Sequence, residues 1–112
     1  MQIGMTGLND WEARALQIDF DSYEWEANNV AGYYPTACPI YLRMLVERKN
    51  HKLLGLQAVG TEGVDKRIDV FATALYNEMT FEQLMDLDLA YAPPFNGVWD
   101  PVQQVAKRYG EF

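Results

Sequence analysis

Cysteine and histidine are almost absent from this sequence of 112 residues, which contains only Cys38 and His51. A single cysteine excludes an internal disulfide framework and is typical of a protein in a reducing, cytoplasmic environment. One cysteine and one histidine are too few for a zinc site, so no metal site is predicted, although a site of carboxylates alone stays open. Cys38 is expected to be a small, partly buried residue and His51 a solvated turn residue.

Long apolar runs are missing as well, and the first six residues have neither the basic flank nor the apolar centre of a signal peptide. Basic residues are outnumbered, 9 against 16 acidic ones, for a net charge of -7. This balance argues against a nucleic acid or an anionic membrane as partner. The length predicts one domain over residues 1–112, which would bury roughly two thirds of its unfolded surface.

The sequence also lacks G-x-G-x-x-G, the glycine-rich turn that cradles a pyrophosphate at the start of a helix. The nearest candidate, Gly55 to Gly63, lies between an expected strand and an expected helix, but its glycines have the wrong spacing. A helix N-terminus can bind an anion, yet a tight turn into the helix is the favoured interpretation. No cofactor-binding residue is therefore predicted within this chain.

Strand signals are present in three segments. Residues 18–26 alternate between apolar and polar, and residues 27–39 then form a loop that holds three of the sequence's breaker residues, Gly32, Pro35 and Pro39. Alternation resumes over 40–47, and a polar turn separates it from the apolar run 53–59. Two such runs joined by a short polar turn predict a β-hairpin.

Helix signals surround these strands. Asn9 with Glu12, and Thr80 with Gln83, have the spacing of a capping box before a short helix. Proline after Asp100 favours the start of a last helix, because the first helical position needs no amide donor. The sum is an α+β fold, a short antiparallel β-sheet with flanking helices. Its two longer helices have apolar faces at Val64, Ile68, Phe71 and Leu75, and at Val102, Val105, Ala106 and Tyr109.

The segment Leu87–Asp100, LDLAYAPPFNGVWD, combines aromatic residues with two successive prolines. Each proline fixes φ and removes a backbone donor, so the segment is predicted to be a stiff, extended loop. It presents Tyr91 and Phe95, and rigid loops with aromatic side chains commonly present a surface to a ligand or partner.

Several of these pieces carry a family resemblance. AGYYP at 31–35, PIYL at 39–42, LLGLQAVGTEGVDKRIDV at 53–70, DLDLAYAPPF at 86–95 and DPV at 100–102 come in a fixed order. Together they resemble the C-terminal dimerisation domain of FAD-dependent pyridine nucleotide-disulfide oxidoreductases, in the coenzyme A-disulfide reductase and NADH oxidase branch. The resemblance implies a homodimer whose FAD- and NAD(P)H-binding domains are absent from this chain, so the chain alone is expected to be inactive.

The same resemblance implies a role for three tyrosines. Tyr91 and one of Tyr33 and Tyr34 would reach across the dimer toward the partner subunit's redox cysteine and its thiol substrate. A phenol with a pKa near ~10 is a proton donor at neutral pH and can hydrogen-bond a thiolate or protonate a leaving thiol. Glutathione-type relatives use a histidine in this loop, where Ala92 and Pro93 stand here, which favours the coenzyme A-disulfide branch. Simple packing is the alternative for each tyrosine.

Two other functions stay open at this point. The chain could be a free-standing binding module that kept the fold and binds a protein partner or a small thiol such as coenzyme A. A small thiol enzyme using Cys38 is a weaker possibility, since Ala37 and Pro39 supply no charge that would activate the thiol. Trp25 and Trp99 depart from the family pattern, as does the tail after Val102.

Overall fold

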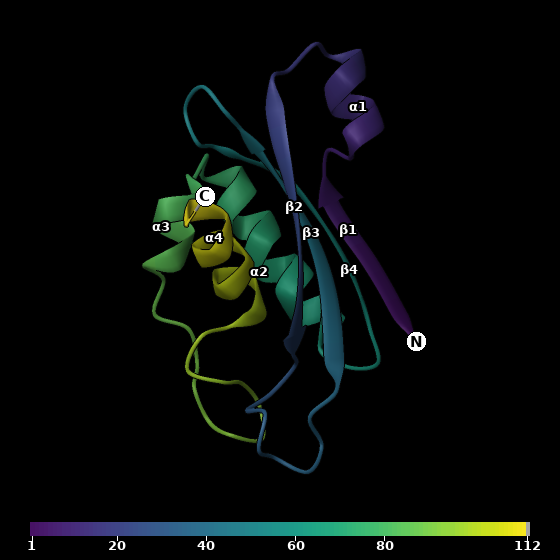
Figure 1. Cartoon of the computed structure of the whole chain (residues 1–112), viewed down its shortest axis with the longest axis vertical. Helices are drawn as coiled ribbons and strands as arrows, with labels where there is room; N and C mark the ends of the chain where they lie inside the picture. Colours follow the sequence, from purple (N-terminus) through teal and green to yellow (C-terminus); the bar gives the residue numbers. More distant parts are fainter. Residues whose placement is uncertain (112) are drawn as a thin grey trace.

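The computed structural model describes residues 1–111 as a single antiparallel sheet with three helices packed on one face (Figure 1). The strands follow the order β1-β4-β3-β2. A fourth helix, α1, lies beyond one end of the sheet. The elements are β1 (Gln2–Gly7), α1 (Asp10–Ala15), β2 (Phe20–Asn28), β3 (Pro39–Glu47), β4 (Leu53–Gly60), α2 (Val64–Tyr76), α3 (Phe81–Met85) and α4 (Pro101–Gly110).

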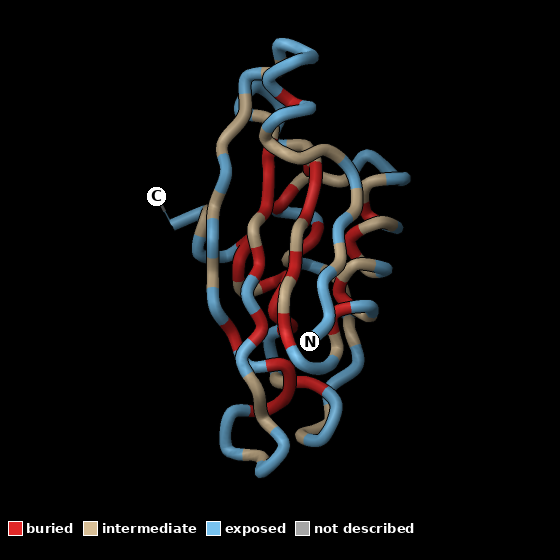
Figure 2. The backbone as a smooth tube through the Cα atoms, turned by 90° about the vertical axis from the view of Figure 1, so that its right-hand side faces the viewer, coloured by how far each residue is buried: buried red, intermediate tan, exposed pale blue. Residues whose placement is uncertain are grey.

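The predicted hairpin is confirmed as β3 and β4 at the centre of the sheet. Met44 pairs with Leu56, and both side chains are buried. His51 closes the turn in the left-handed region with φ 64° and is exposed, as expected. The alternating pattern of β3 places Ile40, Leu42, Met44 and Val46 in the core, whose buried residues run along the central strands (Figure 2).

Strand β1 was not among the predicted elements. It pairs with β4 along the sheet edge, from Gln2 opposite Gly60 to Gly7 opposite Gly55. Its sequence, QIGMTG, shows only a short alternation interrupted by glycines, so periodicity alone gives no strand signal. The hydrogen bonds to the neighbouring strand β4 are what define β1 as a strand.

The helix starts agree with their capping signals. Asn9, Thr80 and Asp100 each accept a hydrogen bond from the backbone of the first turn, and each forms a complete capping box. In α2, Val64 and Phe71 are buried while Ile68 and Leu75 pack at the core margin. In α4, Val102, Val105 and Ala106 are fully buried. The α+β fold is therefore confirmed.

Candidate functional site at the uncharged end of the domain

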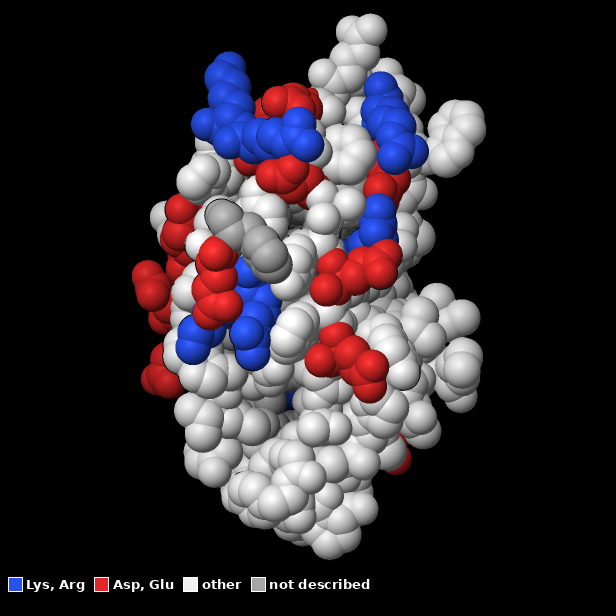
Figure 3. Space-filling view, in the orientation of Figure 1, with Lys and Arg blue, Asp and Glu red and all other residues white. Residues whose placement is uncertain are grey.

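Two loops lie side by side at the end of the sheet opposite α1 (Figure 1). We call residues 29–38 the Tyr33 loop and residues 86–100 the Tyr91 loop. The sequence has no Asp, Glu, Lys or Arg between Glu26 and Arg43, and none between Asp88 and Asp100. Figure 3 shows the result, a lower end of the molecule that is free of charged side chains while the upper part is densely charged.

The structure brings together two of the three predicted tyrosines. Tyr33 and Tyr91 are near enough for hydrogen bonding to Tyr91 to raise the pKa of Tyr33 above its ordinary value of 10.0. Both rings are exposed, Tyr33 at 76% and Tyr91 at 53%. Tyr34 is half-buried, and its backbone closes the turn by donating to the Ala31 carbonyl at 2.9 Å. Two neutral phenols are thus offered to solvent from two different loops.

Each loop is closed by its own asparagine. The Asn29 amide donates to the Cys38 carbonyl at 2.9 Å, and the Cys38 amide donates back to Asn29 Oδ1 at 2.8 Å. In the Tyr91 loop, the Asn96 amide donates to the Ala92 carbonyl at 2.8 Å. The prediction of a loop over 87–100 is confirmed, because its only pairing is the isolated bridge between Ala92 and Asn96.

A buried arginine lies behind both loops. Arg67, in the first turn of α2, is only 2% exposed. Its Nη2 donates to the Asn29 carbonyl at 2.6 Å and to Asn96 Oδ1 at 3.2 Å, and its Nη1 donates to the Gly63 carbonyl at 3.1 Å. Its Nε lies 3.4 Å from Asp100 Oδ2 in an ion pair. Burial lowers the pKa of Arg67, which the Asp100 charge partly offsets.

Arg67 is not among the site residues predicted from the sequence. A signal was nevertheless present in the spacing. Val64, Arg67, Phe71 and Ala74 recur at intervals of three, four and three, which places the arginine on the buried face of α2. A charge on that face needs a partner, because an unpaired buried charge is strongly unfavourable.

The turn into α2 is filled by the protein's own groups. Gly63 has φ 80°, a left-handed conformation, and a side chain there would collide with Arg67 Nη1. The Val64 amide donates to Gln2 Oε1 at 3.2 Å. The first amide of α2 is therefore already paired with a side chain of the protein.

Cys38 and His51 occupy unrelated places. Cys38 is half-buried at the base of the Tyr33 loop, and its thiol donates to the Thr36 carbonyl at 3.4 Å. His51 lies at the opposite end, where Nδ1 is 2.7 Å from Glu82 Oε2. Within residues 1–111, no group of three or more His, Cys, Asp or Glu side chains is arranged to hold a metal. No helix in this range is long and apolar enough to cross a membrane.

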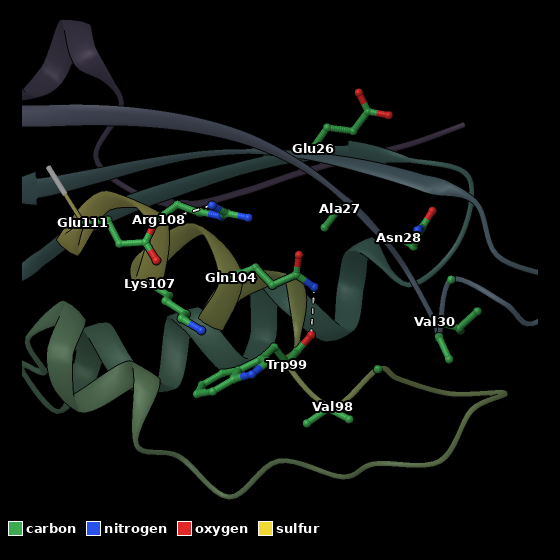
Figure 4. A pocket seen from close by; sticks show the side chains of 13 residues that line it. Glu26, Ala27, Asn28, Val30, Val98, Trp99, Gln104, Lys107, Arg108 and Glu111 are labelled. Carbon is green, nitrogen blue, oxygen red and sulfur yellow. Dashed lines mark hydrogen bonds and ion pairs between the residues drawn. The ribbon is translucent and has the colours of Figure 1, made fainter.

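A cleft of about 660 Å³ opens beside the Tyr33 loop, between the end of β2 and α4 (Figure 4). The two unusual tryptophans are held at this place. Lys107 Nζ lies 4.8 Å from the centre of the Trp99 ring, and the Arg108 guanidinium lies 4.6 Å from that of Trp25. Gln104 accepts from Trp25 Nε1 at 3.2 Å and donates to the Trp99 carbonyl at 2.9 Å. The tryptophans therefore fasten α4 to its neighbours.

Comparison with known proteins identifies the class of domain. Residues 1–101 match the family described as pyridine nucleotide-disulphide oxidoreductase, dimerisation domain. The chain is 38% identical over 89 residues to the coenzyme A disulfide reductase of Staphylococcus aureus (strain bovine RF122 / ET3-1), covering 80% of this chain and 20% of that protein. It is 42% identical over 79 residues to the Staphylococcus epidermidis enzyme of the same name, covering 70% and 18%.

Solved structures give the same result. A NAD-dependent persulfide reductase from A. fulgidus superposes with a TM-score of 0.92 at 39% identity, over 98% of this chain and 22% of that one. Reduced CoADR-RHD of Bacillus anthracis gives 0.93 at 38% identity, over 97% and 20%. The water-forming NADH oxidase of Lactobacillus brevis shares the fold, with a TM-score of 0.91 at 19% identity over 97% of this chain and 24% of that one.

The chain belongs to the pyridine nucleotide-disulphide oxidoreductase dimerisation domain family. It spans about a fifth of the length of the curated relatives that it matches. Membership implies parent enzymes that depend on FAD and NAD(P)H and that oligomerise through this domain.

Proposed function

We propose that this domain builds a homodimer and completes the active site of a FAD- and NAD(P)H-dependent disulfide reductase. In this proposal, residues 1–112 form one unit, and its uncharged end faces the redox thiol of the partner subunit in a cytoplasmic enzyme. The observation that carries the proposal is the neighbouring pair of exposed phenols, Tyr33 and Tyr91, on two segments without charged residues, 27–42 and 89–99. Interface centres are depleted in charge and enriched in tyrosine, which agrees with this surface.

The chemistry follows from the protonation state of the pair. Hydrogen bonding of the Tyr33 hydroxyl to Tyr91 raises the pKa of Tyr33, so the Tyr33 hydroxyl remains protonated throughout the neutral range. Cleavage of a disulfide by a thiolate expels a second thiolate, whose negative charge a phenol can stabilise by a hydrogen bond. An uncharged surrounding strengthens that bond, because fewer competing charges and less water act on the sulfur.

The names of the relatives support a small disulfide as the substrate class. The 38% and 42% identical enzymes are coenzyme A disulfide reductases. For such a substrate, one NAD(P)H and one proton convert the disulfide into two thiols and NAD(P)⁺. Ala92 and Pro93 stand where glutathione-type relatives carry a histidine, so Tyr91 is the phenol that this loop offers as a proton donor.

The test is substitution of the tyrosines in the flavoenzyme that contains this domain. Tyr33→Phe and Tyr91→Phe are each expected to lower kcat for disulfide reduction roughly 10- to 100-fold, the effect of losing one hydrogen bond to a charged group. Tyr76→Phe is the matched control, because this side chain is 90% exposed on α2. Flavin content and dimer mass should not change in any variant.

Three other outcomes would redirect or contradict the proposal. A loss confined to Tyr34→Phe would assign the role to the half-buried neighbour instead of Tyr33. Unchanged kcat in both Tyr33→Phe and Tyr91→Phe would contradict the active-site role. Saturable coenzyme A binding by the isolated monomeric chain, measured by calorimetry, would favour the free-standing binding module instead.

A further inference from the structure

The two tyrosine-bearing loops need an external constraint to keep their phenols paired. Each loop is closed by its own hydrogen bonds at Asn29 and Asn96, but closure of one loop does not determine its position relative to the other. A direct backbone hydrogen bond between them runs from the Ala31 amide to the Pro93 carbonyl at 3.3 Å. That is a long bond, and the sequence supplies no Asp, Glu, Lys or Arg between Glu26 and Arg43 or between Asp88 and Asp100 to reinforce it.

We propose that Arg67, with Asn96 and Asp100, is a positioning cluster that sets the distance between the Tyr33 loop and the Tyr91 loop. This inference rests on the proposed function, in which the two phenols act together on one sulfur. Arg67 on α2 is 2% exposed, and Asn96 and Asp100 of the Tyr91 loop are each 1% exposed.

The geometry of the guanidinium carries the argument. Nη2 has two N–H groups, and they are divided between the loops, one to the Asn29 carbonyl and one to Asn96 Oδ1. Nη1 is fastened to the Gly63 carbonyl on α2. Because the guanidinium is planar and rigid, the position of Asn29 relative to Asn96 is determined by one side chain.

Asp100 orients the cluster from its other side. Asn96 Nδ2 donates to Asp100 Oδ2 at 2.8 Å, which turns Asn96 Oδ1 toward Arg67. The same oxygen faces Arg67 Nε, while Asp100 Oδ1 accepts from the Val102 amide at 2.9 Å. Asp100 thereby ties the cluster to the start of α4. A lysine at 67 would keep the charge but lose the planar fork that reaches both loops.

The alternative is that the cluster only stabilises the packing of α2 against α4. The two roles predict different effects when one contact of the cluster is weakened. A positioning role requires that weakening the cluster separates the loops while the rest of the fold stays intact. A purely structural role predicts loss of protection spread evenly over the domain.

Asn96→Ala is the variant that separates these roles, because it removes the link from Arg67 to the middle of the Tyr91 loop and leaves the Arg67–Asp100 pair at the end of that loop. Hydrogen exchange at the Ala31 amide is expected to accelerate at least about 10-fold, since this amide bridges the loops. Exchange at Leu53, whose amide donates to Met79 at 3.0 Å in the remote part of the fold, should not change. The Tyr33 phenol, titrated by NMR, should move to a lower pKa, toward that found in Tyr91→Phe.

Asn77→Ala is the matched control, since Asn77 caps the opposite end of α2 by donating to the Thr73 carbonyl at 2.8 Å. It should leave Ala31 exchange unaltered. If Asn96→Ala does not fold, Arg67→Lys carries the test with the same expected result. Unchanged Ala31 exchange, or equal acceleration at Ala31 and Leu53, would overturn the inference. Because the readout needs neither flavin nor substrate, its failure is distinct from failure of the tyrosine variants in the enzyme.

Discussion

Asp21 and Tyr109 show how a single hydrogen bond connects distant parts of the chain. The Tyr109 hydroxyl donates to Asp21 Oδ2 at 2.6 Å and so fastens the end of α4 to β2. This bond, followed by that from Arg48, lowers the pKa of Asp21. Burial and the neighbouring carboxylate raise the pKa of Tyr109 to about 12. The pair is therefore a neutral phenol bonded to a carboxylate over the whole neutral range.

The lowered pKa of Asp21 predicts a specific acid response. Since the folded pKa lies below the unfolded value of 3.8, the stabilisation is complete above that value and is lost as pH falls through the folded pKa. Tyr109→Phe should lower the free energy of unfolding by about 1 kcal/mol at neutral pH, a modest value because the pair is partly exposed. Urea unfolding across pH should show this difference shrinking in acid.

The control for this prediction is Tyr76→Phe, which removes a phenol that is 90% exposed. It should change the free energy of unfolding by less than about 0.5 kcal/mol at every pH. A difference between wild type and Tyr109→Phe that stays constant down to the lowest pH would contradict the role given to Asp21.

At the scale of elements, strand β4 is in close contact with the backbone of Leu8, the residue that follows β1. The Leu8 amide donates to the Leu54 carbonyl at 2.9 Å, and a side chain on Gly55 would overlap the Leu8 backbone. This crossing directs the chain from β1 toward α1 over the open face of the sheet. Glycine at this position is therefore a requirement of packing between elements.

Gly55→Ala is expected to lower the free energy of unfolding by about 2 kcal/mol or more, because backbone atoms of Leu8 must move. Gly97→Ala is the matched control, since the nearest atom to its added carbon is the Trp99 carbonyl at an ordinary 3.7 Å. That change should be neutral or stabilising by up to about 1 kcal/mol. Equal losses in the two variants, measured by urea unfolding, would show that the crossing is not the cause.

At the scale of the whole molecule, charge is distributed unevenly. The net charge is -7, yet the tyrosine loops have no charged residue over 27–42 or 89–99, and the lower end of the face in Figure 3 is formed by uncharged side chains. Two copies of this negatively charged chain repel each other at long range, whereas their uncharged surfaces do not repel each other. Obligate homodimer interfaces bury about 2,000 Å² or more, and much of that area is apolar or aromatic.

The isolated chain is therefore expected to self-associate, with affinity that rises with salt. Raising the salt from about 0.05 to about 0.5 M shortens the range of repulsion between like-charged copies. Sedimentation velocity should show a larger dimer fraction at the higher salt. A strictly monomeric chain at high micromolar concentration would contradict the homodimer, and weaker association in salt would indicate contacts between opposite charges.

Much of the fold could be predicted because its signals are local. The β3–β4 hairpin, the capping boxes at Asn9 and Thr80, the helix start at Asp100 and the loop around Tyr91 each depend on residues close in sequence, and the structure agrees with them. Strand β1 could not be predicted, because its pairing with β4 joins residues that are 48 to 58 positions apart, from Gly7 and Gly55 to Gln2 and Gly60. A short edge strand with glycines has little propensity of its own.

The sequence by itself determined the α+β class, the stiff loop around Tyr91 and the three tyrosines that the family resemblance singles out. Only the tertiary structure decided which of Tyr33 and Tyr34 meets Tyr91, and only it revealed Arg67 behind them. The physical reason is the range of the interactions. Capping, turns and alternation act over a few residues, whereas a guanidinium that bridges Asn29 and Asn96 becomes visible only when folding has brought them together.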